Sequence, residues 1–159
     1  KKEAARDTFA KLAKDFPKSP HAAESLINVG DYAYQEKKDY AAAAEAYDKS
    51  LQAGATDSLG ESALHMLGWS LFNQNDFVNA GKRFAEQVTK YPQGKKLADG
   101  TFMAGESLFK QNQYEAALPQ LEQASALELS SPLYRELALV HAAQSASQLK
   151  KWDLTLKLA

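Results

Sequence analysis

The ten residues GWSLFNQNDF, at positions 68–77, return as GESLFKQNQY at positions 105–114. The Gly, the Ser-Leu-Phe run and the Gln-Asn pair are unchanged, and each stretch closes on an aromatic residue. The interval is 37 residues, and self-similarity at a fixed interval of this size is typical of repeat architectures, in which one supersecondary unit is used several times. This stretch therefore predicts a chain of similar units that pack on one another.

Three other sets of positions keep nearly the same interval. They are the aromatic residues Tyr40, Phe77, Tyr114 and Trp152, the small residues Gly30, Gly68, Gly105 and Ala143, and the apolar residues Phe9, Tyr47, Phe84 and Leu121. We expect one repeat domain over residues 1–159, and we interpret it as part of a longer protein because the chain opens on Lys rather than Met. The expected units are residues 2–17 (partial), 20–57, 58–94, 95–131 and 132–159 (partial), with one extra residue in the turn of the first complete unit.

Each complete unit carries two helical patterns. In the second complete unit, apolar residues recur every three to four positions from Leu64 and again from Phe77, which predicts two amphipathic helices. Asp76, in the polar turn between them, can cap the second helix by accepting a backbone N–H. Because strand alternation is absent, the predicted fold class is all-α. Pro119 interrupts the second helix of a later unit, so we expect that helix to start late or to bend.

The composition excludes several classes of function. The chain has 159 residues, of which 45% are hydrophobic and 25% charged, with a net charge of −1 and no basic block. A nucleic-acid partner is therefore not expected. Since there is no cysteine, disulfides, thiol catalysis and cysteine zinc sites are excluded. No run of eighteen apolar residues is present, so this segment is not expected to insert into a membrane.

No motif indicates chemistry. His21, His65 and His141 lie far apart in the sequence, without metal-ligand spacing, and are predicted to be surface or rim residues. Carboxylates such as Asp31 and Glu36 fall on polar helix faces, where we expect them to be solvated. The nucleophile elbow and the glycine-rich phosphate loop are also missing. We therefore predict no active site, no cofactor and no metal site, and the chain is not expected to be an enzyme.

The residue pattern resembles the tetratricopeptide repeat. That family has a large apolar residue, Leu-Gly, an aromatic or Leu, then Ala, an aromatic and Pro, and residues 61–94 match in spacing as well as in residue type. The matching residues are Leu64, Leu67, Gly68, Leu71, Ala80, Phe84 and Pro92. The resemblance implies a right-handed superhelix of helix pairs, whose first helices line a concave face where partner peptides lie.

The units are longer than the family standard of 34 residues. The added residues lie in FPKSPHAAES, at 16–25, and in YPQGKKLADG, at 91–100. These linkers resemble those of bacterial envelope members of the family, such as the lipoprotein of outer-membrane assembly and the TolA-binding coordinator protein. The resemblance implies a periplasmic or cell-envelope location, with a cytoplasmic location as the alternative.

A second stripe on the first helix of each unit, rotated by about 100° from the packing stripe, supplies the candidate partner-binding residues. Large aromatic side chains at such positions would act as anchors for a protein or peptide partner. Phe72 and Phe109 recur at the repeat interval, so packing of one unit on the next is the favoured explanation for them, whereas Trp69 has Glu106 as its counterpart and is not needed by the repeat. The candidate residues are Tyr34, His65, Trp69, Phe72, Phe102, Glu106 and Phe109.

The sequence thus leads to two hypotheses. The first is a non-catalytic scaffold that binds a partner peptide or protein through the concave face formed by the first helices. The second is a structural spacer or oligomerisation segment of a larger, envelope-associated protein, in which the aromatic residues are buried between units or between protomers.

Overall fold

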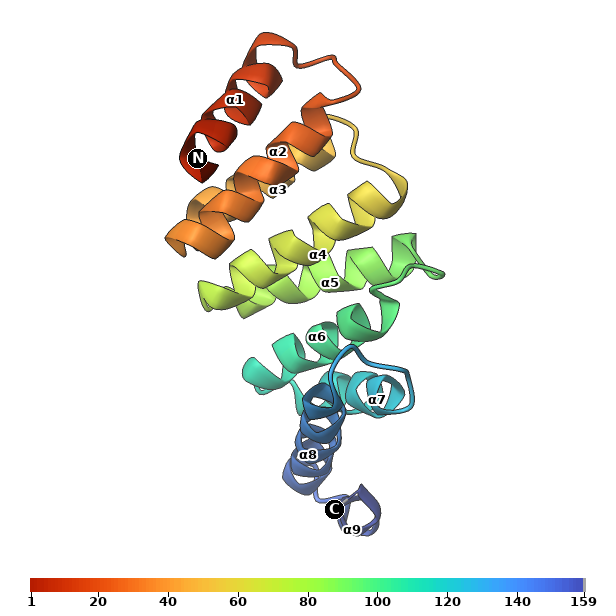
Figure 1. Ribbon diagram of the computed structural model, residues 1–159. Helices are drawn as coiled ribbons and strands as arrows, with labels where there is room; N and C mark the ends of the chain where they lie inside the picture. The colour runs from red at the N-terminus through yellow and green to blue at the C-terminus, as the bar shows by residue number, and fades with distance from the viewer. Residues whose placement is uncertain (159) are drawn as a thin grey trace. The chain divides into compact units, whose positions relative to one another are not determined.

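The computed structural model describes residues 1–158, and within that range the chain is helical without any strand (Figure 1). The prediction of an all-α fold is confirmed. None of these helices is long and apolar enough to cross a lipid bilayer. The helical segments are α1 Lys2–Asp15, α2 Ala22–Tyr32, η1 Ala33–Lys37, α3 Tyr40–Gln52, α4 Asp57–Asn73, α5 Phe77–Lys90, α6 Leu97–Lys110, α7 Tyr114–Ser125, α8 Pro132–Gln148 and α9 Trp152–Leu158.

The chain divides into two compact units. The first runs from Lys1 to Asp76 and the second begins at Phe77. In the first unit α1 packs on α2, α2 on α3, and α3 on α4, each helix lying beside its successor (Figure 1). In the second unit the same succession runs from α5 to α9, and α6 also contacts α8. Helices adjacent in sequence thus supply the core of each unit, as the repeat pattern predicts.

The small residues of the repeat make room for large ones on the following helix. A Cβ atom built on Gly30 of α2 would lie 2.7 Å from Cε1 of Tyr47, whose ring is fully buried on α3. The hydroxyl of Tyr47 donates to Oδ1 of Asp31 at 2.7 Å. Burial, together with this bond, raises the pKa of Tyr47 far above its ordinary value. The solvated role predicted for Asp31 is wrong, because its carboxylate accepts a bond from a core side chain.

The extra residue of the first complete repeat unit, residues 20–57, lies in a helix and not in a turn. Residues Ala33–Lys37 form a π-helical turn that continues α2, and the N–H of Asp39 reaches back six residues to the carbonyl of Ala33. The corresponding bond in the next repeat unit, from the N–H of Asp76 to the carbonyl of Leu71, spans five residues. Our placement of the insertion in the turn was therefore wrong, and the wider π-helical turn absorbs it. Asp39 then caps α3 by accepting from the N–H of Ala42 at 3.0 Å.

Pro119 does not delay the start of its helix. The helix α7 begins at Tyr114, and Pro119 lies inside it with its ring exposed. The predicted late start is therefore wrong, whereas the alternative, a bend at Pro119, stays a prediction. The helix tolerates a lost backbone hydrogen bond, a defect that costs about 3 kcal/mol in a helix interior.

The repeated Gln of the doubled stretch joins successive helix pairs. Nε2 of Gln74, just after α4, donates to the carbonyl of Tyr40 at 3.1 Å, at the start of the preceding pair's second helix. Nε2 of Gln111, just after α6, donates in the same way to the carbonyl of Phe77 at 3.1 Å. In the first pair an ion pair between Lys2 and Glu36, 2.7 Å long, spans the same 34 residues. In these three pairs the position thus ties the pair to the helix that precedes it.

The repeated Ser and Asn have separate structural roles. Ser70 and Ser107 are fully buried, and each hydroxyl donates to the carbonyl four residues earlier. Asn75 and Asn112 adopt left-handed backbone conformations, with φ of 62° and 57°, which asparagine tolerates better than most residues. These residues end the first helix of each pair and allow the short turn into the second.

Candidate functional site

In the first unit the candidate residues gather around Trp69 of α4. Its indole Nε1–H donates to Nε2 of His65 at 3.1 Å. The indole ring also meets the ring of Phe72 edge-on, with centroids 5.9 Å apart. His65 is buried, at 6% exposure, whereas Trp69 and Phe72 are half-buried. The bond to the buried imidazole holds the indole in one orientation, so Trp69 offers a partly exposed, pre-oriented aromatic surface.

Tyr34 joins this group through Asn73, a residue that the sequence pattern does not single out. Nδ2 of Asn73 donates to the hydroxyl of Tyr34 and to the carbonyl of Trp69, both at 2.9 Å. Tyr34 in turn meets the ring of Tyr40 edge-on at 5.2 Å. The π-helical turn that holds Tyr34 is thereby fastened to the end of α4. We call the group of Tyr34, His65, Trp69, Phe72 and Asn73 the Trp69 cluster.

In the second unit the candidate residues gather around a buried carboxylate. Glu106 of α6 is 7% exposed, and its Oε2 lies 2.5 Å from Nδ1 of His141 on α8. Its other oxygen lies 3.4 Å from Nζ of Lys110. The His141 ring stacks on Phe109 with centroids 4.2 Å apart and an interplanar angle of 8°. We call these four residues the Glu106 cluster. Its carboxylate is already paired, so it is not an open acidic site.

Phe102 packs inside the second unit. It is 2% exposed and stacks on Tyr134 of α8 at 5.1 Å. The pKa of Tyr134 is raised by its partial burial and by the charge of Asp99. Phe102 therefore packs α6 on α8, and its ring is not an accessible anchor.

The histidines differ from the prediction in two of three cases. His21 is exposed, as expected of a surface residue. His65 is buried and His141 has 14% of its side chain exposed, so the prediction of surface positions is wrong for both. The sequence does contain a signal for His141, since it falls at the repeat register where Met66 and Met103 stand. A histidine in place of methionine marks a departure from the repeat, as Trp69 does.

No group of three His, Asp or Glu side chains within residues 1–158 is placed to hold a metal ion. The polar contacts of both clusters instead fix the orientation of aromatic rings. Such surfaces are suited to binding other macromolecules.

The chain belongs to the tetratricopeptide repeat family. Models of that family match residues 1–58 and 102–149, and a further one matches residues 62–94. No curated protein sequence matches the chain. The match over residues 62–94 coincides with the unit in which the motif is most complete.

Solved structures share the fold. The structure of YrrB, described as a TPR protein with an unusual peptide-binding site, is 17% identical, with a TM-score of 0.72 over 98% of this chain and 75% of that chain. A putative kinesin light chain of Podosopora anserina with nearly identical TPR-like repeats is 16% identical, with a TM-score of 0.73 over 99% of this chain and 81% of that chain. At these identities the similarity establishes the helical-repeat fold.

Proposed function

We propose that this chain is a non-catalytic protein-binding module, which captures a peptide or protein segment through the Trp69 cluster on the first helices of its repeats. The observation that carries the proposal is the fixed, half-buried indole of Trp69, held by His65 at a register where the next unit has Glu106. Packing of the repeat does not require a tryptophan there. Aromatic rings held in one rotamer lose little entropy on binding and make effective anchors. The peptide-binding site reported for YrrB agrees with a role of this kind.

The test uses a displayed peptide library. Peptides that bind the wild-type chain are selected from it, and their binding to Trp69→Ala is then measured. The matched control is Trp152→Ala, because Trp152 is the other tryptophan, lies on α9 and is 59% exposed. We expect selected peptides to bind Trp69→Ala at least tenfold more weakly and Trp152→Ala as well as wild type, since a central aromatic anchor is worth about 2 kcal/mol or more. Equal binding to Trp69→Ala would refute the site.

The Glu106 cluster enters the proposal as a second contact region. Phe109 is half-buried and Lys110 is exposed, and the His141 contact fixes the Phe109 ring. Phe109→Ala tests this region separately from Trp69→Ala with the same selected peptides. Unchanged affinity for Phe109→Ala would restrict the binding surface to the Trp69 cluster.

An oligomerisation segment is the second candidate function, and one observation favours it. Trp152 and Leu156 lie four residues apart on α9 and are 59% and 79% exposed, so they form an apolar helical face. Such a face is available to a second protomer. Light scattering between micromolar and millimolar concentrations tests this, with Leu156→Ser as the variant. A monomer throughout this range would eliminate the candidate.

We further propose that residues 1–159 belong to a single repeat domain, which small-angle scattering of the whole chain would test. The two long linkers at 16–25 and 91–100 support a location in the bacterial envelope. Cell fractionation of the full parent protein tests that location, and recovery in the cytosol would refute it.

A further inference from the structure

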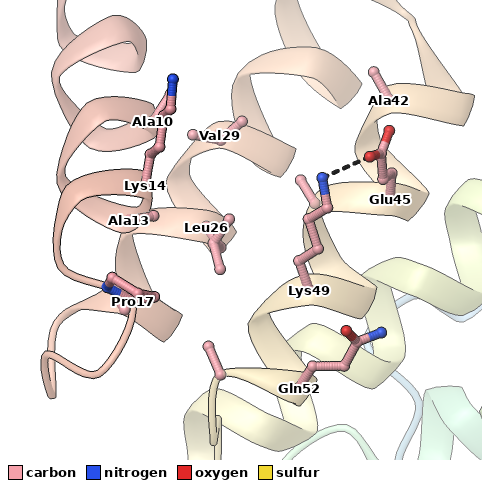
Figure 2. Close-up of a pocket in the computed structure, with 13 residues that line it drawn as sticks. Ala10, Ala13, Lys14, Pro17, Leu26, Val29, Ala42, Glu45, Lys49 and Gln52 are labelled. Carbon is pink, nitrogen blue, oxygen red and sulfur yellow. Dashed lines mark hydrogen bonds and ion pairs between the residues drawn. The ribbon is translucent and has the colours of Figure 1, made fainter.

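A groove in the first unit is lined by residues of α1, α2 and α3 (Figure 2). Its volume is about 680 Å³. Helices α1 and α3 form its walls and α2 forms its floor, where Leu26 and Val29 lie half-buried. Tyr34, on the π-helical turn that continues α2, and the α4 residues of the Trp69 cluster are not among the residues that line the groove. The groove is therefore distinct from the surface in the proposed function.

The walls of the groove are helical faces on which alanines stand between longer polar residues. The lining residues on α1 are Ala10, Ala13 and Lys14, with Pro17 just beyond the helix, and those on α3 run at helical spacing from Ala42 to Gln52, with Ala53 just beyond. The α3 wall thus spans about 15 Å at 1.5 Å per residue. Six of the thirteen lining residues are alanines. Small walls leave room for several large apolar side chains, although not for a whole helix.

The small residues on α3 are not a requirement of the repeat. Ala46 lines the groove and is 5% exposed. The same register holds Arg83 in α5 and Gln120 in α7, so the fold accepts a long polar side chain at this position. The alanine therefore keeps open a space that other units of the same chain do not require.

The chemistry of the walls selects a helical occupant over an extended one. Because the backbone groups of α1, α2 and α3 are bonded within their own helices, the walls offer few main-chain donors or acceptors. An extended segment would bury its own N–H and C=O groups against alanine methyls, at a cost of about 1–3 kcal/mol for each unpaired group. A helix satisfies its backbone internally and presents only side chains, as in helix-in-groove recognition.

The charges at the rim of the groove indicate which charged residue the bound helix carries beside its apolar face. Lys14, on the α1 wall, is exposed and forms no ion pair within residues 1–158. On the opposite wall Nζ of Lys49 is bonded to Glu45 at 2.6 Å (Figure 2). The rim therefore carries one uncompensated positive charge, on the α1 side. We propose that this groove binds an amphipathic α-helix of a partner protein, with large apolar residues on one face and an acidic residue placed against Lys14.

The test uses a synthetic peptide probe in place of the partner helix. The probe is a capped, fluorescein-labelled peptide of about fourteen residues, with leucines at helical spacing on one face and glutamates beside them. Fluorescence anisotropy measures its affinity for the whole chain. Ala46→Arg copies the residue at the same register in α5 and fills the groove, and its control is Ala41→Arg, an exposed position on α3 outside the lining. Circular dichroism confirms that each variant is folded.

We expect saturable binding to the wild-type chain and to Ala41→Arg, and affinity at least tenfold lower for Ala46→Arg. Lys14→Glu should weaken binding about fivefold and recover it with a probe in which lysines replace the glutamates, while Lys11→Glu, outside the lining, should change little. The fivefold figure corresponds to about 1 kcal/mol for an exposed charge pair. Trp69→Ala should bind the probe normally, so failure of this site and failure of the proposed function are distinguishable.

Four results would overturn the inference. They are absence of saturable binding to the wild-type chain, equal binding to Ala46→Arg, loss of binding in Trp69→Ala, and equal binding of a proline-containing probe that cannot form a helix. A dimer of the unliganded chain that Ala46→Arg abolishes would instead assign the groove to a second copy, and would contradict a separate helical partner.

Discussion

Gly100 and Gln87 form a pair whose members should be replaceable together but not singly. A Cβ atom on Gly100 of α6 would lie 2.7 Å from Nε2 and 2.9 Å from Oε1 of Gln87 on α5. Gln87 is fully buried, and its Nε2 donates to the carbonyl of Lys96 at 2.8 Å. One repeat earlier the same registers hold Ser50 and Ala63, both fully buried. The repeat thus uses either a long polar residue with glycine or a short one with alanine.

The expected magnitude follows from these contacts. Gly100→Ala gains about 1 kcal/mol of helix propensity. It also displaces the Gln87 amide and leaves a buried polar group unpaired, which costs about 1–3 kcal/mol, and crowding in a packed core costs a similar amount. We expect a net loss of about 2 kcal/mol. Gln87→Ser alone should lose about 1–2 kcal/mol through the missing bond and the space left behind. In the double variant the alanine methyl occupies part of that space, so its stability should be no lower than that of either single variant.

Urea denaturation followed by far-ultraviolet circular dichroism measures all four proteins of this double-mutant cycle. We expect a coupling free energy of about 2 kcal/mol, because the two residues are in contact. Gly54→Ala serves as a comparison for backbone strain without a clash, since Gly54 has φ of +94°, which alanine rarely adopts, and a Cβ atom added to it would meet no heavy atom within 4 Å. Additivity of Gly100→Ala and Gln87→Ser within about 0.5 kcal/mol would refute the reasoning.

Four other predictions concern stability. Tyr47→Phe should cost about 1–2 kcal/mol near neutral pH, because it removes the bond to the half-buried Asp31. The raised pKa keeps Tyr47 protonated in the folded protein, whereas the same side chain ionises above pH 10.0 in the unfolded protein. Alkaline denaturation should therefore show that the wild type loses stability above that pH and that the variant loses less. Gln111→Ala removes two side-chain bonds to backbone carbonyls and should cost about 1–2 kcal/mol in urea; an unchanged midpoint would contradict the joining role. Pro119→Lys restores a helical N–H at an exposed position, so it should raise the free energy of unfolding by up to about 3 kcal/mol and raise the thermal midpoint; a lower midpoint would show that the proline is needed. Amide exchange should be fastest at residues 1–15 and 150–159, because α1 buries only Ala13 and α9 buries none of its described residues; uniform protection along the chain would disprove this.

The fold could be predicted from the sequence because the same helical pattern recurs in successive repeat units. The helical stripes from Leu64 and Phe77 both lie on helices, in α4 and α5. The π-helical turn is not predictable from the pattern, because one inserted residue is compatible with a longer turn or a wider helix; in the structure the wider helix holds Tyr34, whose ring meets that of Tyr40. Asp76 as a cap stays a prediction, although Asp39 has this role at the same register.

The candidate site was less predictable, because its contacts join residues from different units of the repeat. The pattern placed Glu106 on a solvent-facing stripe, but the structure buries it against His141, 35 residues later. The residue pattern of one helix does not show which later helix will pack over it. The useful signal was departure from the repeat, which marks Trp69 and His141 and, in the groove of the first unit, Ala46. Phe102, chosen for its aromatic ring alone, lies in the interior.

The bonds from Gln74 and Gln111 have a consequence for how such a chain can lengthen. Each side chain donates to a backbone carbonyl, at Tyr40 or at Phe77, and a carbonyl is present at that position whatever side chain stands there. The joint therefore needs a particular residue on one side only. A duplicated copy of residues 58–94 would carry its own glutamine and meet an acceptor already in place, so gene duplication could add a helix pair without a matching substitution in its neighbour.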